Sequence, residues 1–249
     1  MIQDLHAHTY YSFCGRDRPE VIVEAAIAGG IELFGICDHN HGIGFARKDA
    51  YKAPVEIIGM DYERNLIRYF DHIHLIKEKY ADRIRILRGI EVTTRTDIPK
   101  IALPDTADIS FFDYCLVENL DMGDGSIMKG DIFSFAERCG CGAVGLAHTD
   151  LLGFLEQSGM DAYRYLCRMA EMGIFWEMNV NYDTIHKHRI HPYMLRFFEE
   201  EEQQAMVWES GLRLSVGFDG HRTEDYLPKR VADYCRRITD MGIKLAFEE

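Results

Sequence analysis

The sequence of 249 residues lacks the features that mark several large classes of proteins. No stretch approaches the roughly 18 consecutive apolar residues of a membrane-spanning helix, so we expect no membrane segment. The first residues, Met1–His6, carry neither a basic segment nor a long apolar run, so we expect no secretory signal. The seven cysteines are odd in number and scattered, which argues against a disulfide framework and predicts reduced thiols in the cytoplasm.

Basic residues are scarce relative to acidic ones. With 28 Lys and Arg against 41 Asp and Glu, the formal net charge is −13. Such a surface repels a phosphate backbone at long range, so a nucleic-acid partner is disfavoured. A small phosphorylated substrate stays compatible, because bound metal ions reverse the potential inside a pocket. The oligomeric state is left open by the sequence.

The chain contains no repeat, low-complexity tract or linker, and we expect a single domain over residues 1–249. Strand-like runs alternate with amphipathic helical stretches. The expected strands are Ile2–His6, Leu33–Asp38, Ile84–Glu91, Tyr114–Val117, Gly142–His148, Ile174–Asn179 and Leu212–Asp219. The expected helices lie near 19–29, 61–80, 130–140, 160–172, 192–210 and 229–240.

This alternation predicts an α/β protein with parallel strands, either a closed barrel or an open doubly wound sheet. A dinucleotide-binding sheet would carry a glycine fingerprint after its first strand, where this chain has His6, Ala7 and His8. The barrel is therefore favoured.

Chemically competent side chains stand at the ends of the expected strands. In a parallel barrel these ends meet on one rim, where barrel active sites are built. Imidazole and carboxylate groups together suit zinc, manganese or iron. The residues concerned are His6, His8, Asp38, His39, Glu91, His148, Glu177, Asn179, Asp219 and His221.

This ordered series resembles the polymerase and histidinol phosphatase (PHP) family. The resemblance spans residues 4 to 222 and implies a distorted seven-stranded, TIM-like barrel that hydrolyses phosphate esters with two or three divalent metal ions (Zn, Mn or Fe). It further implies a first metal held by His6, His8, Glu91 and Asp219. Glu91 would bridge to a second ion that also takes His148, and His39 and His221 would hold a third.

Two positions depart from the family pattern. In the loop after the first histidine pair, where relatives have histidine or aspartate, Cys14 fits best by spacing and Asp17 is the alternative ligand. After the fourth strand, where relatives have a histidine, this chain reads Val117, Glu118, Asn119 and, two residues on, Asp121. Either Glu118, Asn119 or Asp121 would substitute there, or the second ion would be held more weakly.

The implied mechanism is hydrolysis of a small phosphomonoester, histidinol phosphate being one candidate, by metal-activated hydroxide. Asp219 would orient the attacking water, and His221 would protonate the leaving oxygen if it is not fully committed as a ligand. Arg16 and Arg222 flank the ligand loops and would hold the phosphate, because guanidinium matches its oxygens.

Two other functions compete with this one. An amidohydrolase-type barrel would cleave C–N bonds, but its bridging lysine is not found near Glu118. A degenerate barrel would instead keep a metal for stability and act as a binding or regulatory module. Cys139 and Cys141 are too closely spaced and too isolated along the chain to predict a zinc site, and the stretch from His186 to His191 is predicted as a surface loop.

Overall fold

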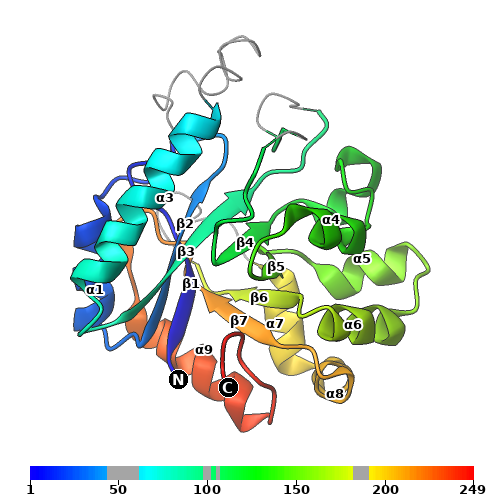
Figure 1. Ribbon diagram of the computed structural model, residues 1–249. Helices are drawn as coiled ribbons and strands as arrows, with labels where there is room; N and C mark the ends of the chain where they lie inside the picture. Colours follow the sequence, from blue (N-terminus) through cyan, green and yellow to red (C-terminus); the bar gives the residue numbers. More distant parts are fainter. Residues whose placement is uncertain (44–61, 98–101, 105–106, 182–190) are drawn as a thin grey trace.

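The structure is a computed structural model that describes residues 1–43, 62–97, 102–104, 107–181 and 191–249. Strands and helices alternate along the chain (Figure 1). The strands are β1 (Gln3–Ala7), β2 (Leu33–His39), β3 (Arg85–Val92), β4 (Tyr114–Val117), β5 (Val144–Leu146), β6 (Phe175–Asn179) and β7 (Leu214–Gly217). The helices are α1 (Pro19–Ala28), α3 (Tyr62–Lys79), α4 (Ile132–Cys139), α5 (Leu151–Gln157), α6 (Ala162–Glu171), α7 (Pro192–Glu199), α8 (Glu201–Ser210) and α9 (Pro228–Asp240), with 3-10 turns η1 (Leu120–Gly125) and η2 (Thr223–Asp225).

The seven strands pair in sequence order and all run parallel. The first and last strands approach each other at one end, where Ala7 bridges Gly220 and the amide of His8 donates to the Gly220 carbonyl over 2.8 Å. Helices surround the strands on the outside (Figure 1). The predicted seven-stranded barrel is confirmed, and it is nearly closed.

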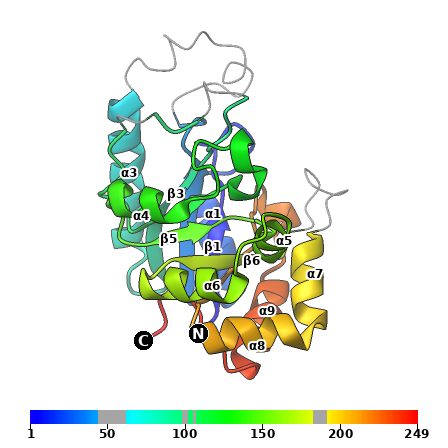
Figure 2. The ribbon, with the colours of Figure 1, turned by 90° about the vertical axis from the view of Figure 1, so that its right-hand side faces the viewer.

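Two apolar layers hold the barrel together. Inside it lies a small cluster that includes Leu5, Leu87, Tyr114 and Phe175, and Ala246 from the C-terminal segment packs against them. The larger layer lies between strands and helices and includes Trp176. Both chain termini lie at the end of the barrel where β1 begins (Figure 2). The opposite end is therefore the one at which the strands deliver their C-terminal residues.

The secondary structure differs from the sequence-based expectation in two places. The helix expected over 192–210 is two helices, because Glu200 is extended (φ −103°, ψ 105°). The Gln204 side chain donates to the Phe197 carbonyl over 2.9 Å and satisfies a carbonyl at the end of α7. Helix α5 was not expected; its signal is Asp150, whose carboxylate caps the helix by accepting from the Gly153 amide over 3.1 Å.

Among the described residues, no helix is both long and apolar enough to cross a membrane.

Candidate metal centre

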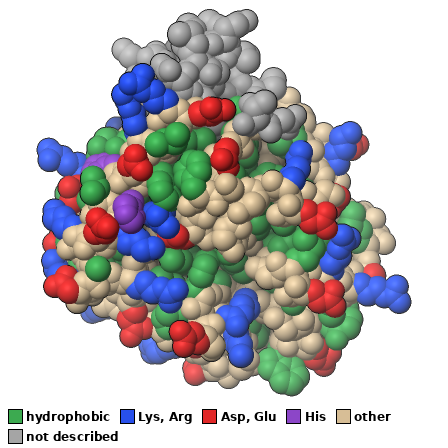
Figure 3. All heavy atoms as spheres, in the orientation of Figure 1, with side chains coloured by type: hydrophobic (Ala, Val, Ile, Leu, Met, Phe, Trp, Pro, Cys, Tyr) green, Lys and Arg blue, Asp and Glu red, His purple; other side chains and the backbone are tan. Residues whose placement is uncertain are grey.

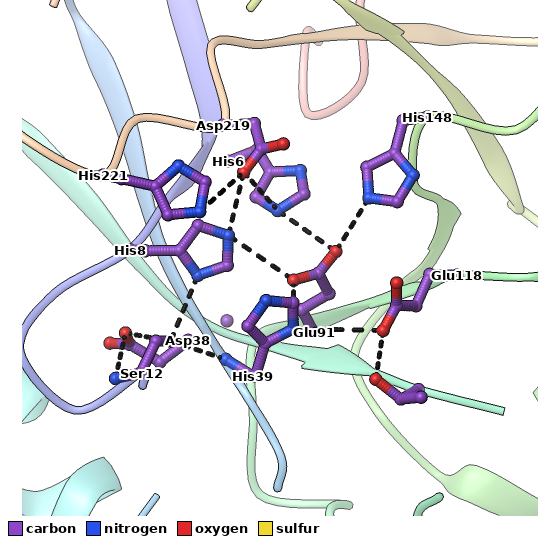
Figure 4. Close-up of polar contacts among 12 residues, drawn as sticks. His6, His8, Ser12, Asp38, His39, Glu91, Glu118, His148, Asp219 and His221 are labelled. Carbon is purple, nitrogen blue, oxygen red and sulfur yellow. Dashed lines mark hydrogen bonds and ion pairs between the residues drawn. The ribbon is translucent and has the colours of Figure 1, made fainter. Parts of the chain in front are cut away.

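The strand ends bring seven predicted site residues into one buried cluster (Figure 4). Glu91, at the end of β3, is fully buried at its centre, and four histidines from three other strand ends face it. The distances from its carboxylate oxygens are 2.7 Å to His39 Nδ1, 3.1 Å to His148 Nε2, 3.4 Å to His6 Nε2 and 3.5 Å to His8 Nε2. Asp219 lies on the other side of His8, with Oδ1 3.0 Å from His8 Nε2 and 3.7 Å from His221 Nε2.

Irregularities of the backbone orient these side chains toward the cluster. The register of β1 against β2 shifts between Asp4 and Ala7, and the Asp4 carboxylate accepts from the freed His6 amide over 3.2 Å and from the Phe218 amide over 2.9 Å. His148 and Asp219 both have positive φ, 29° and 55°, a conformation that costs non-glycine residues about 1–3 kcal/mol. The surrounding fold holds both residues in strained positions that a bare strand end would not adopt.

Supporting residues fix the orientation of the rings. Glu177, on β6, accepts from His6 Nδ1 over 2.8 Å with one oxygen and from the His148 amide over 2.7 Å with the other. Because its Nδ1 is engaged in this way, His6 turns Nε2 toward Glu91 and Asp219. The Asp38 carboxylate accepts from the Thr9 and Ser12 amides and hydroxyls, so it shapes the loop after β1.

The donor set fits divalent metal ions. Nε2 of His6, Nε2 of His8, Nδ1 of His39 and Oε2 of Glu91 are buried and make no well-oriented hydrogen bond in the described structure, although His39 Nδ1 and Glu91 Oε2 lie 2.7 Å apart. Burying polar atoms that make no hydrogen bond costs free energy. Several such atoms close together therefore indicate the site of a bound ion. Ligand atoms of three groups lie within 4.8 Å of one another: His6–His8–Glu91, His39–Glu91–Glu118 and His8–Cys14–His221.

The charges of the cluster favour a bound cation. Burial would raise the pKa of Glu91, but His39 and His6 hold it well below its usual range. Burial likewise opposes ionisation of Asp219, and His6 and His221 hold its pKa low. His39 and His221 also lower the pKa of the Cys14 thiol against the effect of its burial. The carboxylates and this thiol thus tend toward the deprotonated forms that bind metals.

Cys14 and Asp17, the two alternatives of the first loop, lie in different surroundings. Cys14 is buried and shares a potential ligand group with His8 and His221. Asp17 instead accepts from the amide and hydroxyl of Thr223 over 2.7 and 3.0 Å. It therefore ties this loop to the segment after β7.

The two predicted arginines lie beside the cluster. Arg16, Asp17, Arg222, Thr223 and Glu224 line a cavity of about 390 Å³. Arg16 is exposed, and its amide donates to the His221 carbonyl over 3.0 Å. Arg222 contacts Glu224 at 3.4 Å, while its buried Nε has no hydrogen-bond partner in the described structure.

Sequence reasoning did not single out four residues of this site. Asp4 and Ser12 act from the β1 region and Thr93 from the segment after β3, where its hydroxyl donates to Glu118. His41 is buried beside His39, at a ring distance of 4.9 Å. None of them stands at the last position of a strand, so the strand-end pattern gave no signal for them. Of the surface loop predicted from His186 to His191, residues 186–190 lie outside the described residues, and His191 is half-buried at the start of α7.

Comparison with known proteins agrees with this arrangement. A histidinol-phosphatase of Lactococcus lactis subsp. lactis (strain IL1403) is 28% identical over 130 residues, which is 52% of this chain and 43% of the relative. The chain thus matches less than half the length of this curated relative. A crystal structure of the histidinol phosphate phosphatase from the same organism, complexed with zinc, L-histidinol and phosphate, covers 98% of this chain and 95% of its own (TM-score 0.60, 18% identity).

A second solved structure, of a candidate histidinol phosphatase from Listeria monocytogenes, covers 90% of this chain and 96% of its own, with a TM-score of 0.50 and 15% identity. At such identities the two structures establish the fold alone. The model of the PHP domain matches residues 4–241, nearly the whole chain. The protein therefore belongs to the PHP domain family.

Proposed function

We propose that the protein is a metal-dependent phosphatase that hydrolyses a small phosphomonoester. The observation that carries this proposal is the buried Glu91, surrounded by four strand-end histidines with ring nitrogens at 2.7 to 3.5 Å. A carboxylate so placed bridges ions in multinuclear sites. The L. lactis relative, which acts on histidinol phosphate by its name, supports the substrate class and makes histidinol phosphate the first compound to test.

The ions would be held by groups that the structure brings within reach of one another. His6, His8, Glu91 and Asp219 would hold the first ion, Glu91, Glu118 and His148 a second, and Cys14, His39 and His221 a third. Ions bound there would stabilise negative charge on phosphoryl oxygens and lower the pKa of the attacking water. A site rich in both imidazole and carboxylate suits zinc, manganese and iron.

The chain's own residues would position the substrate and move the proton. Arg222, with its unpartnered buried Nε, and Arg16 would hold the phosphate from the cavity beside the cluster. Asp219 would orient the attacking water through its carboxylate. Where the third ion does not occupy its ring, His221, whose Nε2 lies 3.7 Å from Asp219 Oδ1, would donate a proton to the leaving oxygen. Burial of the cluster excludes bulk water from these contacts.

Glu118 would take the place that a histidine has in relatives. It lies directly after β4, with Oε1 3.9 Å from His39 Nδ1, and its ligand atoms group with those of His39 and Glu91. A carboxylate oxygen is a chemically harder ligand than an imidazole nitrogen, so this part of the site favours harder metal ions. We therefore expect it to accept manganese or iron more readily than an all-histidine counterpart would.

The test measures metal content and turnover on the same sample. Protein purified without chelator should hold two to three ions per chain and hydrolyse histidinol phosphate or a generic phosphomonoester. Chelation should abolish turnover, and zinc or manganese should restore it. Asp219→Ala should lose turnover and keep its fold, while the control Asp240→Ala, at the exposed end of α9, should keep both. Bound metal without turnover on any phosphoester would instead favour a binding module.

We also propose a cytoplasmic protein with a small, phosphorylated partner. All seven cysteines are free, which fits a reducing compartment. The face drawn in Figure 3 intermixes acidic and basic side chains over its described part, a pattern unlike the basic stripe of a nucleic-acid binder.

A further inference from the structure

A second cluster of metal-binding side chains lies outside the strand-end site. It consists of Cys115, in β4, Cys139, the last residue of α4, and Cys141, two residues further on. Their three sulfur atoms lie within 4.8 Å of one another, and we call them the thiol cluster. Cys139 and Cys141 looked isolated in the sequence because their third partner is 24 residues away in the chain, from 115 to 139.

The thiol cluster is separate from the strand-end site. Along β4, Tyr114 and Leu116 belong to the apolar cluster inside the barrel, whereas Cys115 and Val117 belong to the layer under the helices. Cys115 therefore points away from the barrel interior, toward α4. Cys115 is fully buried, while Cys139 and Cys141 are partly exposed.

The local backbone places two thiols around one turn. Gly140, between Cys139 and Cys141, has a φ of 68°. This left-handed conformation ends α4. The Cys141 thiol donates to the Ile109 carbonyl over 2.9 Å, and the Cys139 thiol is 3.6 Å from the Ala136 carbonyl. The turn therefore brings both of these thiols beside Cys115.

The spacing suits one ion. Zinc–sulfur bonds are about 2.3 Å long, so three thiolates on one ion stand up to about 4 Å apart. The three sulfur atoms lie within 4.8 Å of one another, so rotation of the partly exposed Cys139 and Cys141 side chains would bring them to this spacing. A cavity of about 130 Å³, whose lining includes Ile109, Arg138 and Cys139, opens beside the cluster and gives an ion access. Three sulfur ligands without imidazole select soft ions over the harder ones.

We propose that Cys115, Cys139 and Cys141 form a binding site for a thiophilic metal ion of the class of Zn²⁺ or Cu⁺. Binding releases the thiol protons to solvent and leaves sulfur oxidation states unchanged, so no oxidant is needed. The site joins β4 to the end of α4, on the helix side of the barrel. It is independent of the phosphatase activity proposed for the strand-end cluster.

Cadmium is the probe for this site, because cadmium thiolates absorb in the ultraviolet. The full chain carries Cys14→Ser, which removes the thiol of the strand-end site, and is reduced and stripped of metal before titration with Cd²⁺. We expect sulfur-to-cadmium absorption with a three-sulfur shell in X-ray absorption spectra. Adding Cys139→Ser should abolish this absorption and lower bound cadmium by one ion per chain. The matched control, Cys167→Ser on α6, should leave both unchanged.

A cadmium shell of nitrogen and oxygen alone, or unchanged absorption after Cys139→Ser, would overturn the proposal. If the Cys139 variant does not fold, Cys141→Ser replaces it, because that side chain is partly exposed and lies outside any helix. Elemental analysis of protein purified without chelator then identifies the ion: zinc or copper that disappears with Cys139 supports the site. Equal amounts of both metals with and without Cys139 contradict it.

Discussion

Gly217 shows how single residues make room for the metal centre. A Cβ at this position would overlap the Glu177 carboxylate and lie 2.7 Å from the His6 Cβ. The closeness of β7 to the His6–Glu177 pair therefore depends on a missing side chain. Sequence reasoning placed Gly217 in a strand but had no means to see that its neighbours are the proposed ligand His6 and the Glu177 carboxylate that orients it.

Gly217→Ala should displace the Glu177 carboxylate and turn His6 away from Glu91. Loss of such a supporting contact weakens metal affinity by about 10- to 100-fold, and turnover should fall with it. Metal titration of stripped protein measures the affinity directly. Ser215→Ala, at a buried position on the same strand, is the control and should keep native affinity. A Gly217→Ala protein with native affinity would show that β7 adjusts freely around the added methyl group.

Replacing Glu118 tests how the type of ligand at this position sets the metal preference of the site. Replacing it by histidine restores the ligand type of relatives, so Glu118→His should shift metal preference from manganese toward zinc. Glu118→Gln, which keeps the shape and removes the charge, should lose one bound ion without this shift. Competition of the two metals for stripped protein, read by elemental analysis, measures the outcome. An unchanged zinc-to-manganese ratio in Glu118→His would exclude Glu118 from the ligand set.

At the scale of elements, the alternation of strands and helices was predictable because it follows from hydrophobic periodicity. The strand ends, and with them the strand-end histidines and carboxylates, came from the same pattern. Local exceptions were not predictable: the break at Glu200 depends on a side-chain cap from Gln204, and the choice between Cys14 and Asp17 depends on contacts with Thr223 and His221. Contacts made across the fold leave no local pattern in the chain.

Asp113 links three elements at the end of the barrel where the strands begin. Its contacts predict that the stability of the fold depends on pH. Directly before β4, it accepts from Arg88 Nη2 on β3 over 2.5 Å and from Lys77 Nζ on α3 over 3.2 Å. Burial would raise its pKa, but Arg88 lowers it to about 2 from 3.8. The ionised carboxylate thus stabilises the fold fully above pH 3.8, and this contribution is lost as the pH falls through about 2.

Asp113→Asn should therefore lower the free energy of unfolding by about 1.5–3 kcal/mol near neutral pH, the range for hydrogen bonds to charged groups. The difference from the native chain should shrink as the pH falls from about 3.8 toward about 2, because the unfolded carboxyl takes up its proton first and the native carboxyl is protonated only near pH 2. Denaturant unfolding of both proteins over this pH range provides the measurement. Asp233→Asn, which breaks an exposed pair with Arg236, is the control and should change stability by less than about 1 kcal/mol. A difference that is the same at all pH values would rule out the ionised pair as its source.

For the whole molecule, the sequence predicted the PHP barrel, because its ligands sit at strand ends in a fixed order along the chain. It did not predict how the barrel closes. That depends on the bridge between Ala7 and Gly220 and on the C-terminal segment, where the Gln3 side chain donates to the Ala246 carbonyl over 2.7 Å. Strand β1 is thus held by both the end of the chain and β7, and we propose that residues 1–249 unfold as one unit.

Metal removal tests both the metal centre and the proposal that residues 1–249 unfold as one unit. Without ions, the carboxylates of Glu91, Glu118 and Asp219 repel one another in a buried space, so the ions should stabilise the native state. An ion at a thousand-fold excess over its Kd adds about 4 kcal/mol, and each kcal/mol moves the Tm of a chain this long by about 2–4 °C. Chelation should thus lower Tm by about 8–16 °C in a single transition, measured by calorimetry. An Asp219→Ala protein should respond less to chelation. Two separate transitions, only one of them sensitive to metal, would mean that the strand-end site and the rest of the barrel unfold independently.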